Sequence, residues 1–402
     1  MSTLNPRLDH LQPYPFQKLA QQQGTETPNP DLTPLRLSVG EPRHAPPTFL
    51  KDVMAESFDL LRRYPATSGS SELKTAIASW ANTRFKLADQ LDPNAMVLPC
   101  NGTREALFAI VQALVGGRDD TPLVLMPNPF YQIYEGAAIL AGAETGFINN
   151  RPDNQLPDFD SVTVDQWQKC QLLFICTPGN PSGISIPLEQ LARLIELAHE
   201  HNFTIISDEC YSELYLDEQA PVPGLLQAAA QSRYQDFSRC LVFHSLSKRS
   251  NLAGLRSGFV AGDPDLLEAF LLYRTYHGSA MSLQNQALSA AAWSDNQHVV
   301  ENRQLYRHKY DVLCPMLDEH FDYQMPDAGF YLWLNTHSDD IDFAKTLYRD
   351  QHLTVLPGSL LSRDTEQCNP GKGFIRLALV NPLDECQQAI ERLIQHAQRY
   401  RT

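Results

Sequence analysis

Residues 241–258 read LVFHSLSKRSNLAGLRSG, a short apolar run followed by a polar turn that carries a lysine. The run Leu241–Phe243 predicts a buried strand. Ser245 and Arg256 flank Lys248 at spacings that allow both to reach one phosphate, and the planar guanidinium suits the paired oxygens of a phosphate. Because open α/β sheets bind ligands outside the carboxyl ends of their strands, this stretch predicts an α/β fold with a site at the sheet edge.

The same combination of an apolar run and a polar turn recurs along the chain. Strands are predicted over 95–99, 123–126, 171–176, 204–207 and 258–262, with helices between them that include 104–115 and 188–201. Short apolar strands that alternate with helices are typical of a mostly parallel sheet flanked by helices.

The length of 402 residues suits one large domain and a smaller one. Residues 1–46, rich in Pro and Gln, predict an extended arm or part of the small domain, with one short helix over 15–23, lying across the main body or a partner subunit. Residues 47–287 predict the large domain, with further helices over 48–64, 70–86 and 263–282. Residues 288–402 mix helices with strands over 329–334, 353–356 and 374–379, which predicts a small α+β domain.

Composition argues against several classes of protein. The formal net charge of −15 disfavours nucleic-acid and anionic-membrane partners. We expect neither a signal peptide in the polar N-terminal region nor a membrane helix, which needs about 20 apolar residues. The eight cysteines form no CxxC pair, so we expect no metal site and a reducing, cytoplasmic location.

Polar side chains follow each predicted strand. Together they are the kinds of groups that would bind a phosphorylated pyridine aldehyde. Gly102-Thr103-Arg104 opens a helix whose N–H groups can seat a phosphate. Asp208 can keep a pyridine nitrogen protonated, and Tyr211 and Asn180 can hydrogen-bond the neighbouring phenolic oxygen. Taken singly, each has an ordinary alternative as a helix cap, an ion pair or a packed side chain.

Two further groups complete this set. Tyr131 can stack on the pyridine face, although plain core packing explains it equally well. Lys248 can form a Schiff base only as a free amine, a state that burial and neighbouring cations favour. A solvated surface lysine is the alternative, and the surrounding stretch argues against it.

Five stretches together resemble the class I/II aminotransferases of fold type I: Ser38–Pro42, Asn180–Gly183, Asp208–Tyr211, Ser245–Gly258 and Phe374–Ala378. The resemblance covers nearly the whole chain. It implies the fold of the pyridoxal-phosphate-dependent transferases and pyridoxal 5′-phosphate as the cofactor.

The resemblance also implies a role for each matching residue. Lys248 is the Schiff-base lysine and proton carrier, and Asp208, Tyr211 and Asn180 contact the pyridine ring on which Tyr131 stacks. The implied phosphate site comprises Gly102, Thr103, Arg104, Ser245, Ser247 and Arg256. Arg376 clamps the substrate α-carboxylate, with Gly40 and Asn180 nearby. Tyr64 reaches the active site of a neighbouring subunit, which implies a homodimer with shared sites.

Within the family, residues 127–136 and 272–282 are most similar to the succinyldiaminopimelate aminotransferases of bacterial lysine biosynthesis. This implies amino transfer between glutamate and N-succinyl-2-amino-6-ketopimelate. Both substrates are multiply anionic, so an acidic protein must meet them with local arginines, and Arg376, Arg104 and Arg274 are the candidates.

Other functions on the same fold stay open, because a fold does not determine a reaction. The alternatives are an aspartate, aromatic or N-acetylornithine aminotransferase, or a carbon–sulfur β-lyase. A transcription regulator of related fold is disfavoured, because residues 1–37 show no helix-turn-helix pattern.

Overall fold

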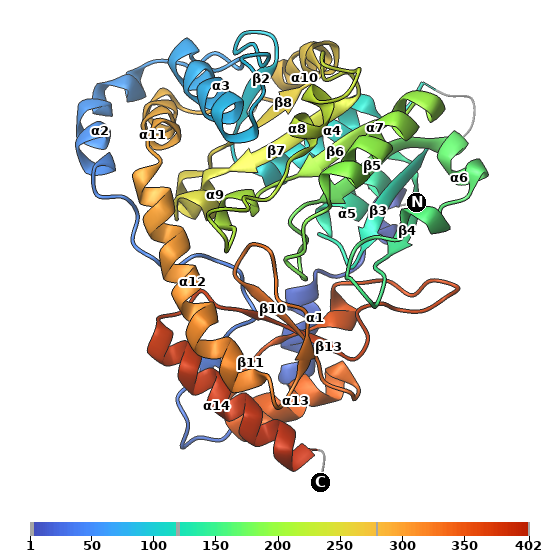
Figure 1. The fold of residues 1–402 in the computed structure, drawn as a ribbon, viewed down its shortest axis with the longest axis vertical. Helices are drawn as coiled ribbons and strands as arrows, with labels where there is room; N and C mark the ends of the chain where they lie inside the picture. Colours follow the sequence, from blue (N-terminus) through green and yellow to red (C-terminus); the bar gives the residue numbers. More distant parts are fainter. Residues whose placement is uncertain (1–3, 118–120, 279, 401–402) are drawn as a thin grey trace.

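A seven-stranded sheet forms the centre of the larger part of the molecule (Figure 1). The computed structural model describes residues 4–117, 121–278 and 280–400. The strand order is β2 (Val97–Cys100), β8 (Gly258–Gly262), β7 (Cys240–Ser245), β6 (Thr204–Asp208), β5 (Cys170–Cys176), β3 (Leu123–Asn128), β4 (Glu144–Asn149). Only β8 runs against its neighbours. The predicted mostly parallel α/β sheet is therefore confirmed.

The register of the parallel strands brings their polar carboxyl ends together. Cys176 pairs with Asp208, and Asp208 pairs with Phe243, two residues before Ser245. The turns that follow β5, β6 and β7 thus open at one edge of the sheet.

Helices cover both faces of the sheet because alternate strand residues point to opposite sides. Leu173 and Ile175 pack with α3 (Ser71–Phe85), α7 (Leu188–His201), α8 (Leu225–Ala230) and α11 (Leu283–Ser294). Leu172 and Phe174 pack with α4 (Thr103–Leu114), α5 (Ile133–Ala141) and α10 (Pro264–His277). Each fully buried aliphatic side chain stabilises this arrangement by about 1.5–3 kcal/mol.

A second, antiparallel sheet forms the core of the smaller part, below the large sheet in Figure 1. Its strand order is β12 (Leu356–Pro357), β13 (Phe374–Ala378), β10 (Tyr331–Asn335), β9 (Asp322–Tyr323). It packs with α12 (Gln297–Leu317), α13 (Asp340–Gln351) and α14 (Leu383–Tyr400). The long helix α12 runs between the two parts.

The remaining elements are short: η1 (Pro6–His10), α1 (Pro15–Gln23), β1 (Leu35–Arg36), α2 (Leu50–Glu56), η2 (Phe58–Arg62), η3 (Phe159–Ser161), α6 (Val164–Lys169), η4 (Ser212–Leu214), α9 (Leu246–Arg249), η5 (Ala253–Leu255), β11 (Leu353–Thr354), η6 (Gly358–Leu360).

The N-terminal arm is fastened to the smaller part by backbone hydrogen bonds. Strand β1 pairs in parallel with β11, and Ala378 N donates to Leu37 O at 2.7 Å. Helix α1 packs near α13. The boundary proposed after residue 287 falls inside α11, which packs against α3, and the domain limits stay a prediction. The terminal residues 1–3 and 401–402 of the predicted domains lie outside the described residues.

Two predicted helices differ from the structure, and one strand was missed. The helix predicted over 263–282 ends at His277, because Gly278 adopts a left-handed C-cap (φ 84°), and residue 279 lies outside the described residues. The helix predicted over 48–64 is divided into α2 and η2 at Ser57. Strand β4 was not predicted, because Glu144–Asn149 is an edge strand without a continuous apolar run.

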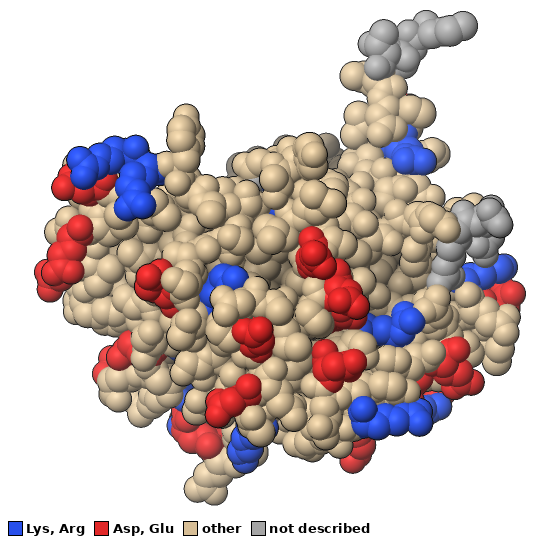
Figure 2. All heavy atoms as spheres, turned by 90° about the horizontal axis from the view of Figure 1, so that it is seen from above, with Lys and Arg blue, Asp and Glu red and all other residues tan. Residues whose placement is uncertain are grey.

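Among the described residues, no helix is both long and apolar enough to cross a membrane. Acidic and basic side chains are interspersed over the face seen in Figure 2.

Candidate active site

Lys248 lies on the single helical turn α9, directly after β7. Ser245 caps this turn by accepting a hydrogen bond from Ser247 N at 3.0 Å. The Lys248 amine donates to the carbonyl of Gly40 on the arm and lies 5.4 Å from the Phe330 ring centre. Burial lowers the pKa of Lys248 to about 8, so a larger share of this amine is neutral near pH 7 than for an exposed lysine.

Asp208 ends β6 as a buried carboxylate, only 5% exposed. One oxygen accepts from the Tyr134 hydroxyl at 2.7 Å, and the other accepts from Cys210 N at 3.3 Å. Burial raises the pKa of Asp208. The Tyr134 ring stacks on Phe174 at 4.3 Å, which holds its hydroxyl in place. Sequence reasoning missed Tyr134, although it stands one helical turn after Tyr131.

A potential anion seat forms where β2 leads into α4. Gly102 has φ 81°, and a Cβ at this position would lie 2.4 Å from Nη2 of Arg256. The glycine therefore allows the guanidinium to approach the N-terminus of α4, whose first residue is Thr103. The Thr103 hydroxyl also lies 3.1 Å from Cys210 Sγ, beside the end of β6.

The hydroxyls of Ser245 and Ser247 lie 2.9 Å apart at the end of β7. Ser245 also contacts the carbonyl of Ser257, the residue after Arg256. Arg256 is exposed, and its Nη1 donates to the Ala253 carbonyl at 2.9 Å. The two serines, Arg256 and the start of α4 are the donors that can bind a phosphate here.

Arg104 and Tyr131 form a pair beside this seat. Arg104 Nε donates to the Tyr131 hydroxyl at 2.7 Å, and its guanidinium lies 6.0 Å from the ring centre of Tyr14. Arg104 is exposed, and its charge contributes to the lowered pKa of Lys248. The exposed guanidinium therefore adds positive charge beside the phosphate seat.

Arg376 enters from β13 and is 3% exposed. Its Nη1 donates to Asn180 Oδ1 at 2.8 Å, and its Nη2 donates to the Ser38 carbonyl at 2.7 Å. Its Nε is buried and has no hydrogen-bond partner among the described residues. The guanidinium also lies 4.3 Å from the ring centre of Tyr331. Arg376 therefore retains free donors, which a carboxylate could accept.

The Tyr211 hydroxyl lies 3.0 Å from the hydroxyl of Tyr331, a second residue that sequence reasoning missed. Tyr331 is also why residue 40 is glycine, since a Cβ there would lie 1.9 Å from its hydroxyl oxygen. Nothing in the local sequence around Tyr331 signals this contact, because β10 reaches the site only through the tertiary fold.

Two predicted residues lie differently from the rest. Tyr64 is 102% exposed in the single chain, so its predicted contact with a neighbouring subunit stays a prediction. Arg274 is fully buried and pairs with Glu105 at 2.8 Å. This arrangement contradicts the suggestion that Arg274 meets a substrate, because its charge is neutralised inside the large domain.

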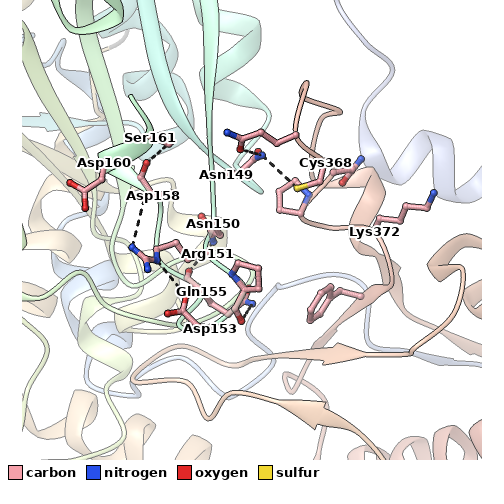
Figure 3. Close-up of a pocket in the computed structure, with 15 residues that line it drawn as sticks. Asn149, Asn150, Arg151, Asp153, Gln155, Asp158, Asp160, Ser161, Cys368 and Lys372 are labelled. Atoms are coloured by element: carbon pink, nitrogen blue, oxygen red, sulfur yellow. Dashed lines mark hydrogen bonds and ion pairs between the residues drawn. The ribbon is translucent and has the colours of Figure 1, made fainter. Parts of the chain in front are cut away.

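A separate cleft of about 700 Å³ lies between residues 149–161 and 367–374 (Figure 3). None of the predicted site residues lines it. Arg151 at this cleft is within 3.4 Å of Asp153 and 3.8 Å of Asp158, so its charge is largely compensated locally.

Comparison with known proteins agrees with this geometry. Residues 33–393 match the family described as "Aminotransferase class I and II". An LL-diaminopimelate aminotransferase of Syntrophobacter fumaroxidans is 29% identical over 401 residues, 96% of this chain and 97% of the relative.

Two solved structures are similar over nearly their full length. An aminotransferase from Neisseria meningitidis has a TM-score of 0.93 and 43% identity, covering 98% of this chain and 99% of that chain. Aminotransferase AspB from Helicobacter pylori has a TM-score of 0.88 and 33% identity, covering 96% and 99%. The chain belongs to the class I and II aminotransferases, which use pyridoxal phosphate to move amino groups between amino acids and keto acids.

Proposed function

We propose that this enzyme exchanges an amino group between glutamate and N-succinyl-2-amino-6-ketopimelate in diaminopimelate biosynthesis. The observation that carries the proposal is the convergence of a buried lysine amine, a phosphate seat and a carboxylate-binding arginine at one sheet edge. The substrate is supported by the resemblance of residues 127–136 and 272–282, and by the relatives that are LL-diaminopimelate aminotransferases.

The residues present fit pyridoxal phosphate. The guanidinium of Arg256 occupies the space that a Cβ at Gly102 would fill, beside the N-terminus of α4. The Asp208 oxygens accept hydrogen bonds from Tyr134 and Cys210, which leaves lone pairs for a pyridinium N–H. The bound cofactor supplies an electron sink for charge that develops at the substrate α-carbon.

Side chains of the protein supply the other functions that the reaction needs. Lys248 tethers the cofactor and carries the proton of the α-carbon, a task suited to an amine with a pKa of about 8. Asp208, oriented by Tyr134, holds the proton on the pyridine nitrogen.

The other residues hold the cofactor in place. Tyr211 and Asn180 would contact its phenolic oxygen, and Tyr131 would stack on its ring. The phosphate donors are Gly102, Thr103, Ser245, Ser247 and Arg256, while Arg104, which the resemblance assigned to the same set, instead faces the substrate.

Two arginines each bind one carboxylate of a substrate that has two. Arg376, beside Gly40 and Asn180, binds the α-carboxylate through its free donors. We assign Arg104 to the distal carboxylate, because it is exposed and close enough to act on Lys248. Arg104 would bind while its Nε remains on Tyr131.

We also propose a homodimer with shared active sites. Apolar side chains are exposed along α2, η2 and the two residues after η2, and the exposed members are Met54, Phe58, Leu61 and Tyr64. Such a cluster is typical of a covered surface, and Tyr64 of the partner subunit would complete the site. Sedimentation of the purified enzyme should show twice the chain mass, and a monomer that is fully active would contradict the shared site.

The LL-diaminopimelate of the relatives' names is a second candidate substrate. The test is a half-reaction screen, in which the enzyme with bound cofactor is mixed with one amino acid and its visible absorbance is followed. Glutamate and N-succinyl-LL-2,6-diaminopimelate should both bleach it. Bleaching by glutamate and LL-diaminopimelate but not by the succinyl compound would reject only the N-succinyl substrate.

The same screen separates the remaining alternatives. Aspartate, aromatic amino acids and N-acetylornithine should react at least tenfold more slowly than the preferred donor. Release of pyruvate and ammonia from cystathionine without a keto acid would instead identify a β-lyase. Failure of every amino acid, glutamate included, would overturn the transaminase assignment of this site.

Arg104→Gln tests the distal contact. Loss of an exposed charged contact should lower kcat/KM for glutamate by about tenfold or more, and leave kcat/KM for alanine within about threefold. An equal loss for both amino acids would show that Arg104 serves the cofactor and not the substrate.

A further inference from the structure

A buried chain of polar side chains links the N-terminal arm to the turn that carries Lys248. Lys309 on α12 is 4% exposed, and its amine lies 2.9 Å from Nε2 of His44 on the arm. His44 Nδ1 lies 2.9 Å from Oδ1 of Asn302, which is also on α12. Asn302 Nδ2 in turn donates to the carbonyls of Lys248 and Arg249, both at 3.3 Å.

This chain touches three segments that bring groups to the active site, namely the arm, the turn of Lys248 and the end of β13. The arm carries Gly40, whose carbonyl accepts from the Lys248 amine, four residues before His44. Lys309 also donates to the carbonyl of Leu379, which follows β13 and its Arg376. Release of His44 would therefore loosen the arm beside Lys248.

The hydrogen bonds determine where the protons lie. Asn302 Nδ2 faces two carbonyls, so its Oδ1 must be the acceptor, and Asn251 Nδ2 also donates to it at 3.0 Å. His44 Nδ1 must therefore carry a hydrogen. Only one proton then remains for the 2.9 Å contact between His44 Nε2 and Lys309, and it can reside on either nitrogen.

A second proton would place two positive charges at this contact. In the part of the chain that the structure describes, no carboxylate lies within ion-pair distance of His44 or Lys309. The groups that face the pair are Asn302 and Tyr306 from α12, the Leu379 carbonyl after β13, and Cys386 of α14.

None of these neighbours offsets a second charge. Burial raises the pKa of Cys386 to about 11, so its thiol is neutral near pH 7. Arg43, the neighbour of His44 on the arm, is exposed and adds no negative charge.

We propose that His44 is a positioning residue, which attaches the arm to α12 through a proton shared with Lys309 and releases it when the pair takes up a second proton. The consequence for catalysis rests on the proposed role of Lys248. Burial and the neighbouring lysine lower the pKa of His44 below its usual 6.5 while the arm is attached, and burial lowers the pKa of Lys309 to about 8. Attachment is therefore strongest near pH 7 and weakens as the pH falls below about 6.5.

The direct test is hydrogen exchange of the arm in the holoenzyme. Peptides that cover residues 37–46 should exchange faster at about pH 5.5 than at about pH 7.5, after correction for intrinsic exchange, by up to about tenfold, because pH 5.5 lies about one unit below the usual pKa of a released histidine. Lys309→Met removes the opposing charge together with the shared proton, so only the Asn302 contact still holds His44 and arm exchange should depend little on pH. His44→Asn keeps a donor for Asn302 but does not titrate, so its arm exchange should not depend on pH.

The kinetic readout is the acid limb of kcat/KM, which should shift to lower pH in Lys309→Met. His308→Asn is the matched control, because His308 lies exposed on the same helix and should leave the wild-type response unchanged. An arm that loosens in acid equally in the wild type and both test variants would overturn the proposal. Exchange does not depend on turnover, so a wrong assignment of Lys248 would leave the arm response intact and remove only its kinetic effect.

Discussion

Replacing Arg376 by lysine tests the proposed carboxylate clamp most sharply. The guanidinium has five N–H donors, of which Asn180 and the Ser38 carbonyl take two, while the buried Nε has no partner. A lysine at this position keeps the positive charge but loses the planar pair of donors that matches a carboxylate. The substitution thus removes the geometry of the contact and not its charge.

The magnitude follows from the loss of one hydrogen bond to a charged group, about 1.5–3 kcal/mol. This corresponds to a loss in kcat/KM of about 10- to 150-fold. Arg376→Ala removes the charge as well, and truncation of a buried charged pair costs about 2–5 kcal/mol, or about 30- to 5000-fold. The loss should be similar for glutamate and for alanine, because both carry the α-carboxylate.

The assay is steady-state turnover with each amino donor, together with the visible absorbance of the bound cofactor and a thermal unfolding curve. Arg392→Lys is the matched control, since Arg392 donates to the Thr33 carbonyl in the smaller part, away from the predicted site residues. A kcat/KM within threefold of wild type in Arg376→Lys would refute the clamp. Loss of cofactor absorbance or stability in that variant would instead show a structural role.

Three further predictions concern the cofactor site. Lys248→Ala should abolish covalent capture of the cofactor by borohydride, seen by mass spectrometry, and slow turnover by about 10²- to 10⁴-fold through loss of the proton carrier; retained capture would rule out this lysine. Gly102→Ala would place a Cβ 2.4 Å from Arg256 Nη2 at φ 81°, so the cofactor Kd measured by fluorescence titration should rise by about tenfold or more; an unchanged Kd would contradict the seat. In the cofactor-free protein, an amine reagent should modify Lys248 with a midpoint near pH 8, because burial favours the neutral amine; a midpoint near pH 10 would show a solvated lysine.

Local sequence anticipated the elements that bury apolar runs on both faces. Helix α7 and strand β8 have the predicted bounds, because their apolar spacing and flanking polar residues are unambiguous. Strand β4 escaped prediction because an edge strand needs fewer buried residues, and its Glu144 and Gly146 interrupt the pattern. A strand buried on both faces has a continuous apolar run, which is easier to recognise in the sequence than the pattern of a strand buried on one face.

Arg274 illustrates the limit for charged residues. Its positive charge and its position in the sequence suggested contact with an anionic substrate. In the structure, Glu105 lies 2.8 Å away, and both residues belong to the larger part of the molecule. The sequence shows that a charge exists and does not show which opposite charge neutralises it. Tyr134 is the opposite case, because its sequence context suggests only a packed core residue, yet its hydroxyl also donates to Asp208.

Local sequence was enough to predict the α/β fold and the polar residues at the strand ends, because periodicity and turn chemistry act between near neighbours in the chain. The family was recognised from the resemblance of five short stretches. Only the tertiary structure decided that Tyr331 meets Tyr211, that Arg376 reaches Asn180, and that His44 bridges Lys309 and Asn302. These contacts join segments separated by more than a hundred residues, and their distances depend on how the two parts of the molecule pack. The local sequence does not encode that packing, because other residues of similar size and polarity could occupy either position of each contact.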